Sequence, residues 1–75
     1  MPKYPVLKAS EIIKVLKKFW FKPVRQKWSH IQLKNIKTKK FTTIPSHPST
    51  TVDPYLLKLI LEQCDVSLEE FMKNL

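Results

Sequence analysis

Residues 27–34, Lys-Trp-Ser-His-Ile-Gln-Leu-Lys, decide the fold and contain the most informative side chain of the chain. The segment predicts a tight turn at residues 28–29, followed by a strand over residues 30–34. Because successive strand residues point to opposite faces, Ile31 and Leu33 share one face. The polar residues of the strand share the other face: His30, Gln32 and Lys34. We therefore expect a sheet with one face in the core and one face open to water.

His30 is the candidate catalytic residue on the polar face. Imidazole is the side chain whose unperturbed pKa lies closest to neutral pH, so it can take or give a proton there. A histidine beside cations such as Lys27 and Lys34 is what the cleavage of a phosphodiester needs. The alternative is that His30 is only a polar residue on a solvated strand face, and the segment alone leaves both interpretations open.

The composition bounds the class of protein. The chain has 75 residues and 43% hydrophobic content, which predicts one small folded domain over residues 1–75. A single Cys excludes an intrachain disulfide framework and favours a reduced, cytoplasmic setting. No segment is long and apolar enough for a signal peptide or a membrane span, so we expect no membrane partner.

The charge is distributed unevenly along the chain. Residues 1–40 carry twelve Lys and Arg against one acid, a balance of +11, whereas residues 41–75 carry two Lys against five acids, a balance of −3. Such an asymmetry predicts a polyanion as the partner of the N-terminal part. Nucleic acid and an acidic protein both satisfy this requirement.

The pattern upstream and downstream of residues 27–34 predicts the other sheet elements and the first helix. A helix of about ten residues is expected with Ser10 as its N-cap. The strand over roughly 21–26 must lie at an edge, because Pro23 cannot donate a ladder hydrogen bond. A third strand is expected over 41–44. Asn35 is the expected left-handed residue of the turn that precedes it.

The C-terminal part predicts two more helices. Asp53-Pro54 begins the first, with Asp as the N-cap and Pro at the first helical position. Ser67 and Glu70 form a capping box at the start of a short last helix. The fold class is therefore α+β, in the order helix, three strands, helix, short helix. We expect a three-stranded antiparallel sheet with the helices packed on one face.

Several segments, in order along nearly the whole chain, resemble one known family. They are Met1-Pro2-Lys3 with Pro5-Val6-Leu7, Phe21-Lys22, Arg25-Gln26-Lys27, Ser29-His30, Ile44-Pro45 with His47, and Leu57 through Ser67 followed by Glu69-Glu70-Phe71. These residues resemble the HicA (YcfA-like) mRNA interferase toxins. The resemblance implies a fold similar to double-stranded-RNA-binding domains, a type II toxin–antitoxin system and cleavage of mRNA. It also implies His30 as the catalytic residue and a HicB-like antitoxin as the protein partner.

The absence of Gly from the chain departs from the family pattern. The family usually has Gly at the positions of Trp20, Trp28 and Asp65. Gly before the Ser-His pair permits a positive φ and a close approach of RNA. Two functions therefore stay open: an active endoribonuclease, or a catalytically weakened RNA-binding or antitoxin-binding module on the same fold.

The resemblance and the residues together predict the site. His30 is expected to act as the general base on a ribose 2′-hydroxyl, with nearby cations stabilising the phosphate. No metal or other cofactor is expected, because the carboxylates are scattered. The expected RNA-binding residues are Arg25, Lys27, Trp28, Ser29, Gln32, Lys34 and Phe41.

Four side chains within or outside this set need separate interpretation. The Trp28 ring either stacks on a base or packs against the turn. Ser29 either orients His30 or the phosphate, or serves only the turn. His47 is expected to be a solvated loop residue and not a general acid. Cys64 lies on an apolar helical stripe and is expected in the core.

Overall fold

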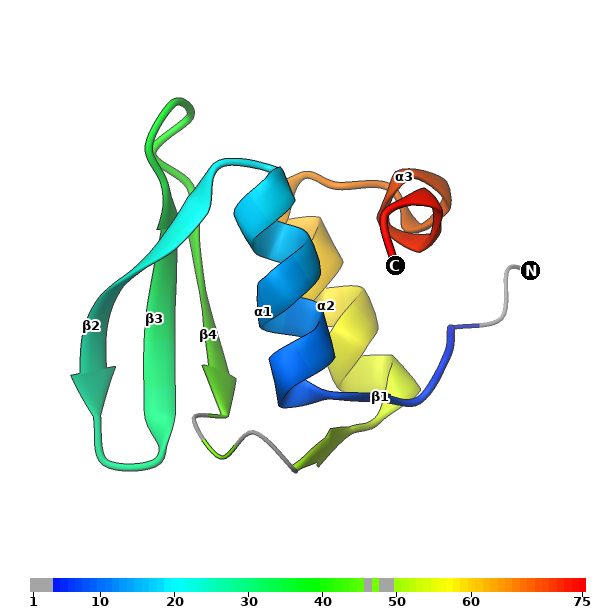
Figure 1. The fold of residues 1–75 in the computed structure, drawn as a ribbon, viewed down its shortest axis with the longest axis horizontal. Helices are drawn as coiled ribbons and strands as arrows, with labels where there is room; N and C mark the ends of the chain where they lie inside the picture. The colour runs from blue at the N-terminus through cyan, green and yellow to red at the C-terminus, as the bar shows by residue number, and fades with distance from the viewer. Residues whose placement is uncertain (1–3, 46, 48–49) are drawn as a thin grey trace.

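The computed structural model describes residues 4–45, 47 and 50–75, and it has the predicted α+β architecture (Figure 1). The elements are β1 (Leu7–Lys8), α1 (Ala9–Lys18), β2 (Phe21–Lys27), β3 (His30–Asn35), β4 (Phe41–Pro45), β5 (Thr51–Val52), α2 (Pro54–Cys64) and α3 (Leu68–Lys73). The matching segment Met1-Pro2-Lys3 lies outside the described residues. The short strands β1 and β5 pair antiparallel in a separate sheet that the sequence pattern does not predict.

The main sheet has the order β2-β3-β4, and both of its pairings are antiparallel. This order confirms that β2, which contains Pro23, is an edge strand. Figure 1 shows α1 and α2 on the same side of the sheet, with α3 farther from it. Phe21, Leu33 and Ile44 are buried on the helix side of the sheet. The opposite face of the sheet is left open, as the alternation in residues 30–34 predicts.

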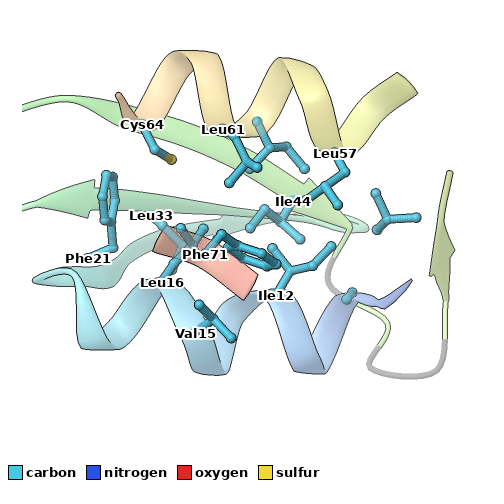
Figure 2. Packing of buried hydrophobic residues seen from close by; sticks show 13 residues of the cluster. Ile12, Val15, Leu16, Phe21, Leu33, Ile44, Leu57, Leu61, Cys64 and Phe71 are labelled. Atoms are coloured by element: carbon cyan, nitrogen blue, oxygen red, sulfur yellow. The ribbon is translucent and has the colours of Figure 1, made fainter. Parts of the chain in front are cut away.

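The core lies between the sheet and the helices. Figure 2 shows apolar side chains from all three strands of the sheet and from the helices meeting in one cluster. Phe71 brings the short α3 into this cluster and is fully buried. Thr42 is also buried, and its hydroxyl donates to Oε1 of Gln63 on α2 at 2.6 Å. This bond satisfies a polar group that would otherwise be costly to bury.

The N-caps of the two C-terminal helices are the predicted residues, but the N-cap of α1 is not. The Asp53 carboxylate accepts from the Leu56 backbone N–H at 2.9 Å, and the Ser67 hydroxyl accepts from the Glu70 backbone N–H at 3.2 Å. Ser10, the predicted N-cap of α1, lies inside that helix, and Lys8 is the N-cap. The reason is tertiary: Lys8 is held extended by its pairing with Thr51, so the chain passes directly from β1 into α1.

Asn35 is not the left-handed residue of the β3–β4 turn, because Lys39 takes that conformation with φ 67°. Asn35 is instead a buried strand residue, 7% exposed. Its Oδ1 accepts from the backbone N–H groups of Lys37 and Thr38 at 2.7 and 2.9 Å. Its Nδ2 donates to the Phe19 carbonyl at 3.0 Å. The side chain therefore ties the end of α1 to the turn between β3 and β4.

Candidate functional site

The open face of the sheet presents three rows of paired residues, each row running across β2, β3 and β4. The rows are Lys27–His30–Pro45, Arg25–Gln32–Thr43 and Lys22–Lys34–Phe41. Directly paired residues on adjacent strands have their Cα atoms about 4.5–5.5 Å apart. His30 thus has a cation as its direct neighbour, and each row contains at least one cation. This is the arrangement expected from the sequence for His30, Gln32 and Lys34.

A bulge in β2 brings Arg25 and Lys27 to the open face. In an unbroken strand both residues would share a face with Phe21, which is buried against the helices. The register shifts between Pro23 and Arg25, so Val24 is left without a partner on β3. One extra residue turns the following side chains to the opposite face. The sequence signal for the bulge is Pro23, since Pro inside a strand is confined to edges and bulges.

A shallow depression of about 220 Å³ lies over the first two rows. Its lining residues are Arg25, Lys27, His30, Gln32 and Thr43. Four of these five were predicted from the sequence. Thr43 was not predicted to belong to the site, because a β-branched residue in a strand carries no chemical signal of its own. The depression therefore joins an imidazole, two cations and two hydrogen-bonding groups.

The remaining predicted residues lie around this depression. Trp28 and Ser29 form the two-residue turn between β2 and β3, and both are exposed. The Trp28 ring is 87% exposed, with the Lys27 ammonium 5.2 Å from its centroid. Lys34 and Phe41 lie in the third row, away from His30. His47 is exposed and does not line the depression.

The electrostatics of the sheet are one-sided. Residues 21–45 contain seven Lys and Arg and no acid. The nearest ion pair joins Lys40, at the end of the turn before β4, to Asp65 at the end of α2, with a distance of 3.1 Å between Nζ and Oδ2. Within residues 4–45, 47 and 50–75, no group of acidic, His and Cys side chains could hold a metal ion. The face is suited to a polyanion.

A larger depression of about 490 Å³ lies at the opposite end of the molecule, between α2 and α3. Its polar lining includes the carboxylates of Glu62, Asp65 and Glu70 and contains no cation. Carboxylates repel phosphate, so this hollow does not serve the chemistry that His30 suggests. Cys64 is buried nearby in the core, and burial raises the pKa of its thiol to about 12, which leaves it without nucleophilic character at neutral pH.

A comparison with protein families matches residues 9–66 to the HicA toxin of bacterial toxin–antitoxin systems. This chain belongs to the HicA toxin family. The match covers the whole open face of the sheet and the turn that precedes His30. HicA toxins function with an antitoxin, so family membership implies an antitoxin partner. No curated protein matches the chain. None of the helices described is long and apolar enough to cross a membrane.

The three positions at which HicA toxins usually have Gly do adopt positive φ in this chain. The φ angles are 72° at Trp20, 55° at Trp28 and 58° at Asp65. The backbone therefore keeps the geometry that Gly would provide. Of the three residues, only Asp tolerates a positive φ well. At Trp28 the positive φ lies at the first central residue of a two-residue hairpin turn, where Gly is favoured in type II′ turns.

Proposed function

We propose that this HicA-family chain, as one domain over residues 1–75, is a metal-independent endoribonuclease that cleaves mRNA. The observation that supports this most strongly is the position of His30. The imidazole lies in an open depression beside two cations of β2, Arg25 and Lys27, on a sheet that bears no acid. Among the described residues, no hydrogen bond or ion pair is found for the His30 side chain. A substrate can therefore orient it.

The proposed reaction is the attack of a ribose 2′-oxygen on the adjacent phosphorus. His30 removes the 2′-hydroxyl proton as the new O–P bond forms. The bond from phosphorus to the 5′-oxygen breaks, and water in the open depression supplies the proton that the leaving oxygen needs. The products are a 2′,3′-cyclic phosphate and a 5′-hydroxyl. Arg25 and Lys27 stabilise the charge that develops on the phosphate oxygens.

The other predicted RNA-binding residues support this chemistry from the same face. Gln32 offers an amide within the depression, and Lys34 extends the cationic surface along β3. Ser29 lies directly before the histidine in the turn. We also propose that a HicB-like antitoxin neutralises the toxin by covering this face with acidic or polar groups, because complementary charge favours such a contact.

The test compares the two histidines of the chain. His30→Ala should lower RNA cleavage by roughly 100- to 10,000-fold, the usual contribution of a general base. His47→Ala is the matched control, because His47 is also exposed but does not line the depression. Cleavage of a long RNA by the purified proteins and growth arrest on expression should both follow this order. A folded His30→Ala protein that cleaves at the parent rate would refute the assignment.

A second function is favoured by one observation, the positive φ of Trp28. A strained turn beside His30 suits a catalytically weakened module that binds RNA or the antitoxin without efficient cleavage. The same assay separates the two. A parent protein that binds RNA but leaves it intact supports the binding module, whereas cyclic phosphate ends on the products support the enzyme.

A further inference from the structure

Two exposed aromatic side chains lie on either side of the depression at His30, along the direction of β3. Trp28 precedes the first row of the open face and is 87% exposed, and Phe41 lies in the third row and is 55% exposed. Neither residue lines the depression. A strand rises about 3.4 Å per residue, so the row of Phe41 lies about 14 Å along β3 from the row of His30.

We propose that this face binds single-stranded RNA, with unpaired bases stacked on Trp28 and Phe41 and the backbone passing over His30 between them. The proposal rests on the proposed RNA-directed function and names its substrate class. Aromatic side chains beside a cationic groove are the usual platform for unpaired bases, since every base has a flat apolar face. Lys22 and Lys34 lie in the same row as Phe41 and supply the charge that the RNA backbone needs there.

A duplex would not use these features. In double-stranded RNA the bases are already stacked on one another, and proteins read the helix through its shape, phosphates and 2′-hydroxyls. A duplex laid on the open face would contact the cations but would leave both aromatic rings without partners. The exposure of one large ring on this cationic face and of another in the adjoining turn therefore favours an unpaired strand.

The first test measures affinity in a His30→Ala background, so that the RNA stays intact. The probes are a short fluorescein-labelled RNA of mixed sequence and the same strand annealed to its complement. Phe41→Leu should weaken single-strand binding by about 5- to 150-fold, the loss expected when one base loses its stacking partner. It should leave duplex binding unchanged. Phe41→Tyr should retain single-strand binding, because it keeps the aromatic face.

Tyr55→Leu is the matched control for the loss of an exposed aromatic ring. Tyr55 is 73% exposed on α2 and does not belong to the sheet. Its substitution should change neither the single-strand affinity nor the duplex affinity. The proposal is overturned if Phe41→Leu binds the single strand as tightly as its parent, or if it weakens single-strand and duplex binding equally. It is also overturned if Phe41→Leu spares RNA but weakens binding of polyglutamate, which would assign the ring to an acidic protein partner.

The second test reports on Trp28 by fluorescence. The chain has two Trp, so Trp20→Phe leaves Trp28 as the only one. Stacking of a base on the indole should quench the fluorescence of Trp28 when the single strand saturates the protein. Saturation with the duplex should leave the fluorescence unchanged. Unchanged emission at saturation would remove Trp28 from the platform.

The failure of this proposal and the failure of the nuclease proposal give different results. If the parent protein binds the single strand through Phe41 but cleaves no RNA, the stacking proposal is supported and the nuclease proposal is refuted. If the parent protein cleaves RNA and Phe41→Leu keeps full single-strand affinity, the nuclease proposal is supported and the stacking proposal is refuted.

Discussion

Replacing Trp28 by Gly should stabilise the fold and weaken RNA binding at the same time. Trp28 has a φ of 55°, in the left-handed region. A non-Gly residue held there costs roughly 1–3 kcal/mol, which Gly avoids. Against this gain, Gly increases the entropy of the unfolded chain, a loss of about 0.4–1 kcal/mol. The exposed contact between Lys27 and the ring accounts for about 0.5–1 kcal/mol more.

With the strain and both losses in the middle of their ranges, the net gain at Trp28 is about 0.5 kcal/mol. For a chain of this size, a gain of about 0.5 kcal/mol raises Tm by roughly 2–4 °C. The ring is 87% exposed, so its removal leaves no cavity to offset the gain. Trp28 does not line the depression, so we expect no rise in activity from extra space.

The assay for this prediction is urea and thermal unfolding of the parent, Trp28→Gly and Trp28→Ala. The Ala variant removes the ring but keeps the Cβ atom, so it keeps the strain. Trp28→Gly should therefore exceed Trp28→Ala by about 1 kcal/mol in the free energy of unfolding. Equal stability of the two variants would show that the turn stores no strain at this residue. Affinity for single-stranded RNA should fall in both variants if the ring is a stacking platform.

Other perturbations test the charge, the turn, the thiol and the partner. Single-strand RNA affinity should fall with salt, with a slope of log K against log salt of roughly −0.7 per phosphate neutralised, and a flat titration would contradict the cationic face. Asn35→Ala should lower the free energy of unfolding in urea by about 2–3 kcal/mol, since it orphans three backbone partners, and a loss below about 0.5 kcal/mol would contradict this. The pKa of Cys64 is raised from 9.0 to about 12 in the folded state, so the thiol's contribution to stability is complete below pH 9 and is lost as the pH rises toward 12. Unfolding midpoints should show this loss relative to Cys64→Ala, and an identical pH dependence of the two proteins would refute it. Lys34→Glu on the sheet should weaken binding of the antitoxin in calorimetry, whereas Lys58→Glu on α2 should not, and the reverse order would place the interface on the helices.

The parts of the fold that were predictable have local causes. The alternation of polar and apolar residues over 30–34 assigns the two faces of β3, because strand geometry leaves no other choice. Asp53 and Ser67 mark helix starts as N-caps, through hydrogen bonds that span only three residues. The position of His30 on the open face is predictable for the same reason, since its face follows from the pattern of its own strand.

The parts that were not predictable depend on distant pairing. The N-cap at Lys8 is decided by its pairing with Thr51, far away in the chain. Asn35 has the composition of a turn residue, but its side chain is recruited by the Phe19 carbonyl at the end of α1. The bulge at Val24 has a local signal in Pro23, yet which residue bulges depends on the register with β3. That register decides whether Arg25 faces the site or the helices.

The positive φ angles of the described residues all lie in connections between elements: Trp20, Trp28, Lys39 and Asp65. The side chains of three of them contact a lysine. Lys37 lies 3.9 Å from the Trp20 ring centroid, Lys27 lies 5.2 Å from that of Trp28, and Lys40 pairs with Asp65 at 3.1 Å.

Exposed contacts of this kind contribute about 1 kcal/mol or less each, which is no more than the lower end of the strain at the two Trp residues. The connections therefore lower the stability of a core that is already small. Binding of the antitoxin to the folded toxin adds stability by mass action, without any change in the core. A chain of 75 residues without Gly can thus depend on its partner for part of its stability, even if its site is independent of the partner.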